Sequence, residues 1–340
     1  DVRIPGLKMT VVAADGQYVQ PVSVDEFRLG VAETYDVIVE PSAEQAYTLF
    51  CQTIDRSGYA RGTLTPDPAM VPIVPEMDDS PILTHADMGM SHGGHDDHHH
   101  AMMHNQSAAG GEGCTPEHAE MGHCEIPEKP KSACTAEHAA MGHCEMPEQS
   151  TNKMVQDFGT GKAGYGTAKT PSFDLIKQGP HIDMTADDAQ YRLDDPGVGL
   201  RNNGRAVLTY ADLFNLNPTP DPREPEREIE LHLTGNMSRY MWSINGVKYA
   251  DADPILMRYG ERVRITLVNN TMMNHPMHLH GVWSDLETGD GQYIPRKHTV
   301  IVQPGAKISY LVTADAIGKW AYHCHLLYHM PSMFREVHIS

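Results

Sequence analysis

Short runs in which apolar and polar residues alternate are the dominant pattern of this sequence. They predict β-strands, because successive side chains of a strand point to opposite faces of the sheet. The clearest runs are residues 229–233 and 263–267, in which Ile, Leu or Val alternates with Glu, His, Arg or Thr. Further strands are expected at residues 299–302, 307–312, 320–323 and 333–339, with Pro304-Gly305 as a turn.

The first seventy residues carry the same signals. Strands are expected at residues 9–13, 35–39 and 47–51, and Asp15-Gly16 is a turn signal. Residues 166–225 are rich in turns, with a short helix or strand between residues 206 and 213. Met241 to Ile244 leads into Asn245-Gly246, a dipeptide that favours a hairpin turn.

Repeated short strands with turn signals predict an all-β fold, a β-sandwich. We expect three parts: part of one domain at residues 1–70, a linker at 71–165 and a complete C-terminal domain at 166–340. Eleven of the 21 histidines lie between His85 and His143, in a tract rich in Gly, Ser, Asp and Met. Such a composition cannot bury a core, so the linker is expected to be disordered without metal.

A repeat lies inside this linker. Residues 114–128 recur as residues 134–148, and each unit offers Cys, His, Met, His and Cys within eleven residues. The candidate metal ligands are Cys114, His118, Met121, His123, Cys124, Cys134, His138, Met141, His143 and Cys144. Thiolate and thioether ligands favour Cu(I), although these ligand types do not exclude zinc, nickel or silver. The alternative is a flexible linker in which each unit forms one disulfide in an oxidising compartment.

Charge and hydropathy narrow the range of partners. The formal net charge is −19 over 340 residues, which argues against nucleic acid or an anionic membrane as partner. No apolar run approaches the roughly 18–20 residues that a membrane-spanning helix needs.

Two short runs near the C-terminus combine residue types that bind copper. They contain His275, His278, His280, His323, Cys324, His325 and His329. Two His and one Cys in a trigonal plane, with a weak axial Met, form the blue-copper arrangement. In a strand, Cys324 points away from the face shared by His323 and His325, so these histidines can reach a second metal site. His278 and His280 have the same spacing and can meet that second site, which leaves His275 and His329 to join Cys324.

Together the two runs resemble the third cupredoxin domain of a multicopper oxidase. Residues 31–37, 191–204 and 228–235 are similar to the copper-resistance branch of that family, found in the bacterial periplasm. The resemblance covers nearly the whole chain, most weakly at 85–150. It implies a cupredoxin-like Greek-key β-sandwich, a periplasmic location, and an oxidase that reduces oxygen to water with electrons from Cu(I) or a small phenolic donor.

The resemblance also implies a role for each ligand. Type 1 copper, which takes electrons from the substrate, would be bound by His275, Cys324 and His329. Type 2 copper would be bound by His278, and the type 3 pair by His280, His323 and His325. The backbone of Cys324 would link the type 1 copper to the trinuclear cluster through its two histidine neighbours.

The sequence departs from the family pattern in its histidines. The family takes half of its eight trinuclear ligands from two His-x-His motifs in an N-terminal domain, and no such motif precedes residue 85 here. We therefore expect this chain to be the C-terminal portion of a longer protein, without the first cupredoxin domain. Alone it should hold type 1 copper but no competent oxygen-reducing centre.

The axial position is a second departure. The family places its axial residue five positions after the last histidine, which here is Phe334. We expect Met333, one residue earlier, to be the weak axial ligand. Two alternatives remain: a three-coordinate copper with non-coordinating Phe334 and a raised potential, or ligation by Met330.

Donor access and overall function leave further alternatives. Met272, Met273 and Met277 would deliver Cu(I) or merely fill gaps in the core. Asp285 and Glu287 would orient a cationic or phenolic donor, or lie on a solvated loop. A non-enzymatic copper-sequestering protein that uses residues 85–148 is the main alternative function. A nitrite-reductase-like enzyme is less favoured, because histidines flank Cys324 on both sides.

Overall fold

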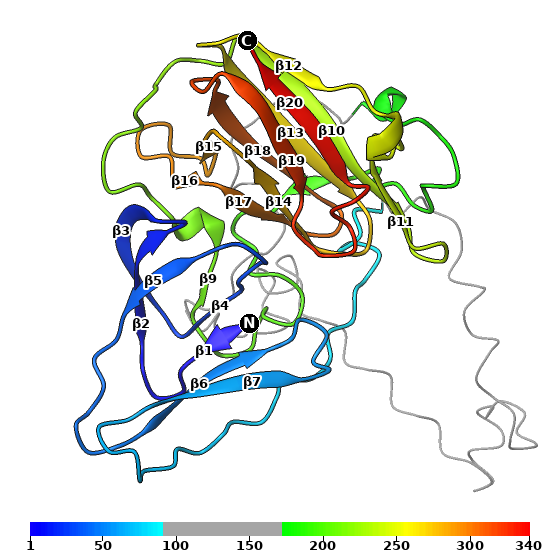
Figure 1. The fold of residues 1–340 in the computed structure, drawn as a ribbon. Helices are drawn as coiled ribbons and strands as arrows, with labels where there is room; N and C mark the ends of the chain where they lie inside the picture. The colour runs from blue at the N-terminus through cyan, green and yellow to red at the C-terminus, as the bar shows by residue number, and fades with distance from the viewer. Residues whose placement is uncertain (91–171) are drawn as a thin grey trace, which may run out of the picture. The chain divides into compact units, whose positions relative to one another are not determined.

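The N-terminal strands of the computed structural model, which describes residues 1–90 and 172–340, form two small sheets (Figure 1). One has the order β7-β6-β1-β4-β9 and the other β3-β2-β5. Their bounds are β1 (Val2–Arg3), β2 (Met9–Ala14), β3 (Gln17–Val24), β4 (Glu26–Phe27), β5 (Tyr35–Ile38), β6 (Tyr47–Gln52), β7 (Tyr59–Leu64) and β9 (Val207–Leu208). Because β9 pairs with β4, a segment from the second half of the chain completes the first sheet.

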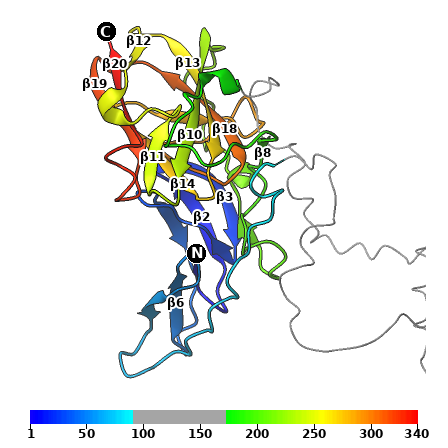
Figure 2. The same cartoon turned by 90° about the vertical axis from the view of Figure 1, so that its right-hand side faces the viewer.

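Two larger sheets contain the C-terminal strands. One has the order β11-β10-β13-β18-β15-β16, with β8 paired to β18, and the other β12-β20-β19-β14-β17. Their bounds are β8 (Gln190–Tyr191), β10 (Arg227–Asn236), β11 (Met241–Ile244), β12 (Ile255–Met257), β13 (Arg262–Asn270), β14 (His275–Leu279), β15 (Ser284–Leu286), β16 (Arg296–Lys297), β17 (Thr299–Val302), β18 (Ala306–Thr313), β19 (Gly318–Cys324) and β20 (Phe334–Ile339). The run β10-β13-β18 is visible in both Figure 1 and Figure 2.

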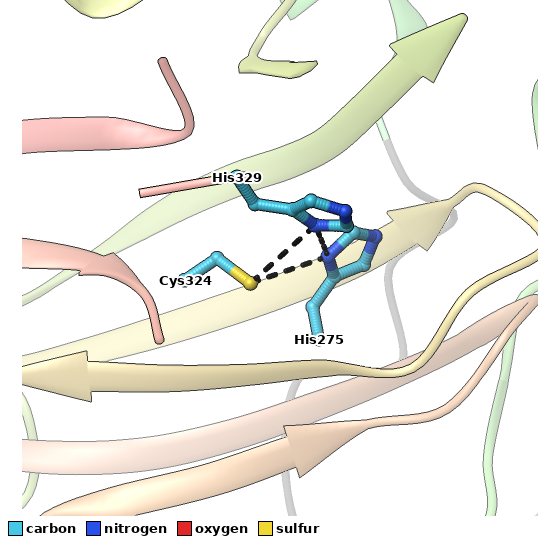
Figure 3. Close-up of side chains that lie close together, drawn as sticks. All are labelled: His275, Cys324 and His329. Atoms are coloured by element: carbon cyan, nitrogen blue, oxygen red, sulfur yellow. Dashed lines mark hydrogen bonds between the residues drawn. The ribbon is translucent and has the colours of Figure 1, made fainter. Parts of the chain in front are cut away.

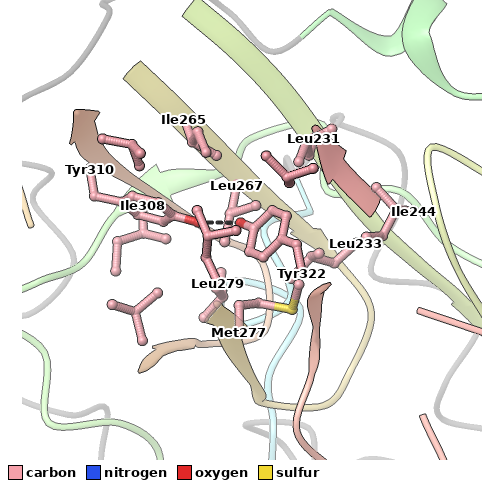
Figure 4. Packing of buried hydrophobic residues seen from close by; sticks show 14 of the residues in the cluster. Leu231, Leu233, Ile244, Ile265, Leu267, Met277, Leu279, Ile308, Tyr310 and Tyr322 are labelled. Atoms are coloured by element: carbon pink, nitrogen blue, oxygen red, sulfur yellow. Dashed lines mark hydrogen bonds between the residues drawn. The ribbon is translucent and has the colours of Figure 1, made fainter. Parts of the chain in front are cut away.

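The larger hydrophobic core lies between these two sheets (Figure 4). Leu231, Leu233 and Ile265 come from one sheet, and Leu279 and Tyr322 from the other. Alternation explains the composition of this core, because each strand turns every second side chain inward. A smaller core of the N-terminal sheets includes Val11, Phe27 and Leu208, among others.

The predicted strands at residues 9–13, 35–39, 47–51 and in the C-terminal third are confirmed. Between residues 206 and 213 the structure contains both expected elements, since β9 is followed by the 3-10 helix η2 (Tyr210–Asp212). The prediction of an all-β sandwich is therefore confirmed for the described residues, whose only helices are η2 and two others, η1 (Phe173–Leu175) and η3 (Tyr249–Asp251). The division at residues 70 and 166 stays a prediction.

The turn expected at Asn245-Gly246 is present, but no long hairpin follows it. Asn245-Gly246 does form a turn with positive φ angles of 53° and 70°, but only an isolated bridge between Ile244 and Val247 closes it. Strand β11 pairs with the preceding strand β10 along four residue pairs. The run that begins at His275 forms strand β14, which pairs with strands on both sides.

Residues 71–90, at the start of the predicted linker, have no regular secondary structure but make specific polar contacts. Asp78 accepts hydrogen bonds from Arg3 at 2.9 Å and from Gln52 at 2.6 Å. Asp87 pairs with Arg201 at 2.5 Å. These buried or half-buried ion pairs hold the segment along the folded unit.

Candidate metal centre

Strands β14 and β19 carry both histidine runs and pair antiparallel to each other. Met277 lies opposite Cys324, and His278 lies opposite His323. Because side chains alternate along each strand, the first pair faces the hydrophobic core and the second faces away from it. Met277 and Cys324 are both at most 1% exposed and belong to the core cluster.

Three donor atoms converge on the core side of this strand pair (Figure 3). Cys324 Sγ lies 3.5 Å from His275 Nδ1 and 3.7 Å from His329 Nδ1, and the two nitrogens are 3.3 Å apart. The centre of such a triangle is about 2 Å from each corner, close to the roughly 2.0–2.3 Å of metal bonds to imidazole and thiolate in zinc sites. The three atoms therefore fit a trigonal metal site.

The protonation chemistry of the three residues also fits a metal. Burial lowers the pKa of His275 well below its usual value and that of His329 to about 4, so both imidazoles are neutral. Burial raises the pKa of the Cys324 thiol to about 12, so without a cation the thiolate is disfavoured. A bound metal cation would displace the thiol proton and neutralise the charge that burial opposes.

Thr271 orients His275 from behind. Its Oγ1 lies 2.7 Å from His275 Nε2, so that an Nε2–H donating to the hydroxyl leaves Nδ1 free to face Cys324. Asn269 accepts the hydroxyl proton of Thr271 at 2.9 Å and donates to three backbone carbonyls, those of Met273, Val302 and Gln303. Neither residue could be identified from the sequence, because the role of each depends on the conformation of a loop.

The register of β19 and β20 separates the three axial candidates. His323 pairs with Phe334, whose ring stacks on the His323 imidazole at 5.7 Å and 7°, on the side away from the core. One residue earlier, Met333 lies opposite Cys324, whose N–H donates to the Met333 carbonyl at 3.1 Å, and its side chain is fully buried. Met330 is only half-buried. Met333 thus shares the Cys324 face, whereas Phe334 does not.

Four imidazoles gather on the opposite side of β14 and β19. Ring centroids are 4.5 Å apart for His278 and His280, 5.3 Å for His280 and His323, and 5.3 Å for His323 and His325. The Nε2 atoms of His280 and His323 approach to 3.1 Å. Burial lowers the pKa of His278 to about 4 and also lowers the pKa values of His280 and His323, which favours neutral imidazoles able to bind metal.

Backbone carbonyls orient two of these rings. His278 Nδ1 donates to the carbonyl of His298 at 2.7 Å, and His323 Nδ1 donates to the carbonyl of Cys324 at 3.1 Å. In both residues Nε2 then carries no proton, so its lone pair can bind a metal ion. A pocket of about 320 Å³, lined by His278, His280 and His298 among others, opens beside them.

A larger pocket of about 680 Å³ is lined by residues next to His275 in the sequence, although not by His275, Cys324 or His329 themselves. Asn274 and Pro276, the neighbours of His275, line it together with Met237, Met272 and Met273. The three methionines expected either to deliver Cu(I) or to fill the core therefore differ in position. Met272 and Met273 line the pocket, whereas Met277 is 1% exposed and packs in the core. Met237, from the turn between β10 and β11, was missed because it is distant in sequence.

The expectation for Asp285 and Glu287 was wrong in both forms. Each carboxylate is 2% exposed, so neither lies on a solvated loop or faces a donor. Asp285 pairs with Arg262 at 2.7 Å and with Arg296 at 2.9 Å, and Glu287 pairs with Arg264 at 2.9 Å. These arginines come from β13 and β16, and such contacts between strands could not be read from the local sequence. The linker candidates, Cys114 through Cys144, lie outside the described residues.

Comparison with known proteins agrees with this geometry. Family models described as multicopper oxidase match residues 1–68 and 222–336. The chain belongs to the multicopper oxidase family. That family binds copper, and the His275, Cys324 and His329 donors form a site suited to it.

Two curated relatives are copper resistance proteins. The chain is 56% identical over 341 residues to copper resistance protein A of Escherichia coli, covering 100% of this chain and 53% of that protein. It is 52% identical over 350 residues to copper resistance protein A of Pseudomonas syringae pv. tomato, covering 100% of this chain and 54% of that protein. The chain therefore spans about half the length of these relatives. Among multicopper oxidases, it is similar to those of the copper-resistance type.

Solved structures agree on the cupredoxin-like fold. Fet3p, described as a multicopper oxidase that functions in iron import, matches with a TM-score of 0.52 at 13% identity, over 100% of this chain and 53% of that one. A mutant laccase from B. aclada matches with a TM-score of 0.51 at 14% identity, over 99% and 48%. Among the described residues, no helix is long and apolar enough to cross a membrane.

Proposed function

We propose that this chain is the electron-accepting part of a periplasmic copper oxidase that oxidises Cu(I), and small phenols as secondary donors, in copper tolerance. The single observation that carries the proposal is the register of β14 and β19. It puts Cys324 on the core face of a strand pair whose opposite face carries four imidazoles. The backbone of this strand pair thus lies between the proposed site that accepts electrons from the substrate and the proposed site that passes them to oxygen.

In this proposal His275, Cys324 and His329 bind the type 1 copper, and Met333 is its weak axial ligand. Copper held there would take up and release single electrons. Thr271 holds His275 with Nδ1 inward, and the surrounding apolar core excludes water from the thiolate. Electrons leave through the peptide backbone of Cys324, which is bonded directly to His323 and His325.

The proposed donor enters through the 680 Å³ pocket. Met237, Met272 and Met273 line it with thioethers, which are soft ligands suited to Cu(I). Replacing Met272 and Met273 by Leu together should raise KM for Cu(I) without changing KM for a phenol. Met277→Leu is the matched control, since its side chain lies in the core. Equal effects on both donors would contradict an entry route through the methionines.

The proposed oxygen-reducing end requires more than these residues. His278 for type 2 copper, with His280, His323 and His325 for the type 3 pair, makes up half of the eight histidines that the family resemblance implies. We propose that four imidazoles from an N-terminal cupredoxin domain complete the cluster. Oxygen reduction to water is accordingly a property of the longer protein, and this chain alone should bind type 1 copper only.

Two measurements test the proposal. The 340-residue chain, loaded with copper, should show an intense blue absorption band that Cys324→Ser abolishes. Supplied with the N-terminal domain, it should consume oxygen when given Cu(I), and His323→Ala should stop the consumption while leaving the blue band. A colourless wild-type chain would refute the type 1 site, whereas a blue protein that never consumes oxygen would refute only the oxidase.

A second function is favoured by the sequence repeat. Each unit combines two Cys, two His and one Met, and we propose that the segment from 85 to 148 binds Cu(I) as a reservoir. Deleting that segment separates the two functions. If copper tolerance is lost while oxygen consumption survives, sequestration is the main function, and if tolerance persists, oxidation is.

A further inference from the structure

Trp242 covers the candidate metal centre on the side of His329. Its indole ring is 1% exposed and stacks on the His329 imidazole, with ring centroids 3.8 Å apart and planes inclined by 23°. The same indole meets His275 edge-on at 5.7 Å and 68°. One side chain therefore contacts both imidazoles whose Nδ1 atoms face Cys324.

Gly235 makes the room for this ring. It lies opposite Trp242 in the antiparallel pair of β10 and β11. A Cβ at residue 235 would come within 2.5 Å of indole Cε3 and 2.6 Å of Cζ3, closer than side-chain carbons tolerate. The backbone of Gly235 is not in the left-handed region, so the glycine is needed for space and not for conformational freedom. A glycine inside a strand is otherwise destabilising, and close approach of another group is its usual explanation.

The turn that joins β10 and β11 adds an outer ring. Tyr240 has a φ of 53°, an uncommon conformation for a residue with a side chain, and its ring meets Trp242 edge-on at 5.7 Å. Tyr240 also lies 6.4 Å from the His329 ring. The hairpin thus sets two aromatic rings in succession over one imidazole.

The buried indole of Trp242 carries an energetic cost. Trp242 Nε1 is buried and has no hydrogen-bond partner among the described residues, and an unpaired buried N–H is costly. A phenylalanine would avoid that cost. The indole differs from a phenyl ring in its larger, more electron-rich face, and that face lies on His329.

We propose that Trp242 is a positioning residue for the copper centre, holding the His329 ring with Nδ1 toward Cys324 and favouring the more highly charged state of the bound metal. Two effects act together. Stacking restricts rotation of the imidazole. Once that imidazole is bonded to a cation its ring is electron-poor, and the electron-rich indole face attracts it, more for Cu(II) than for Cu(I).

This inference rests on the proposed type 1 site, so its test begins with the copper-loaded wild-type chain. Trp242→Phe should keep the blue band but weaken binding of Cu(II) up to about tenfold more than binding of Cu(I). For a one-electron couple a tenfold change in that ratio raises the reduction potential by about 59 mV. Trp320→Phe is the matched control, because this indole lies on β19 and donates its N–H to the Ala316 carbonyl at 2.9 Å, outside the copper ligands.

Gly235→Ala provides an independent route, because it keeps the indole and displaces it. The copper EPR signal of this variant should broaden, since the His329 ring is no longer held in one orientation. The double variant Gly235→Ala with Trp242→Phe should bind Cu(II) within about twofold of Trp242→Phe alone, because the ring edge that the new methyl group strikes is absent.

The outcomes separate the two proposals. No blue band in the wild-type chain would refute the type 1 site itself. A wild-type blue band with unchanged potential and EPR signal in both Trp242→Phe and Gly235→Ala would overturn the positioning role. If Trp242→Phe does not fold, as judged by urea unfolding of the metal-free chain, the EPR signal of Gly235→Ala decides alone.

Discussion

Asp15 and Lys297 form an ion pair of 3.0 Å, with neither side chain exposed to solvent, across 282 positions of sequence. Asp15 Oδ2 also accepts the backbone N–H groups of His298 at 3.0 Å and Thr299 at 3.1 Å. The carbonyl of His298 in turn accepts the Nδ1 proton of His278. A carboxylate from the first fifteen residues therefore supports the loop that orients a candidate copper ligand.

Breaking this pair should destabilise the chain strongly. Lys297→Met leaves Asp15 and the nearby Glu33, 3.2 Å from Lys297, as buried carboxylates without their cation, and Asp15→Asn leaves the lysine with one carboxylate. Removing one partner of a buried pair typically costs about 3–5 kcal/mol. Urea unfolding of the metal-free chain measures the loss.

The double variant is the control for this prediction. Asp15→Asn combined with Lys297→Met should be less destabilised than the sum of the single variants, because the charges of Asp15 and Lys297 are removed together and only Glu33 remains as a buried carboxylate without its cation. Simple additivity would show that the two side chains do not interact energetically. Lys319→Met, at an exposed position of β19, should change the free energy of unfolding by no more than about 0.5 kcal/mol.

Met333 and Phe334 offer a matched pair of substitutions at adjacent positions. Met333 lies on the Cys324 face, and Phe334 stacks on His323 on the other face. Met333→Leu should therefore raise the reduction potential and alter the visible spectrum of the copper-loaded chain, because a weak axial thioether is lost. Phe334→Leu should leave that spectrum unchanged. A changed spectrum in Phe334→Leu together with an unchanged one in Met333→Leu would contradict Met333 as the axial ligand.

The sequence predicted on which face of the strand each candidate ligand lies, but not which residues of other strands lie opposite it. Alternation along one strand sufficed to separate Cys324 from His323 and His325, because that relation is local. The pairing of Met277 with Cys324 and of Met333 with Cys324 depends on register between strands, which the sequence does not state. The same limit explains why Met333 remained one of three axial candidates.

Errors arose where the environment of a residue comes from distant strands. From the local sequence Asp285 resembles a surface carboxylate, whereas in the structure it is paired with arginines from β13 and β16. Thr271 and Trp242 carried no recognisable motif. Gly235 was the one available signal, since a glycine within a strand pattern often marks close approach of another group.

Two buried tyrosines of the core allow a test of hydrogen-bond energetics. The hydroxyl groups of Tyr310 and Tyr322 bond to each other, and both residues are at most 1% exposed (Figure 4). Tyr310→Phe leaves the Tyr322 hydroxyl buried without this partner, at a cost of about 1–3 kcal/mol in unfolding free energy. The double variant to Phe should be less destabilised than the sum of the single variants. Additive losses would mean that the hydroxyl pair contributes nothing.

The stability of the metal-free chain should fall as the pH is lowered from about 6.5 toward 4. Burial lowers the pKa values of His278 and His329 to about 4 and holds that of His275 well below its usual value, so the unfolded chain takes up these protons first. Because the unfolded state then binds more protons, each histidine contributes a slope of about 1.4 kcal/mol per pH unit in that window. Urea unfolding at a series of pH values measures the slope.

His329→Leu serves as the control for this pH dependence, because it removes one of the three groups without adding charge to the core. Between pH 6.5 and 4.5 its free energy of unfolding should depend on pH less steeply than that of the wild-type chain. The difference should approach about 1.4 kcal/mol per pH unit, which is the contribution of one proton. The carboxylates whose pKa values are lowered, such as Asp25 and Asp78, act in the same direction but at lower pH, below their ordinary value of 3.8. An unchanged slope in His329→Leu would show that this imidazole is protonated equally in the folded and unfolded chain, contrary to its burial.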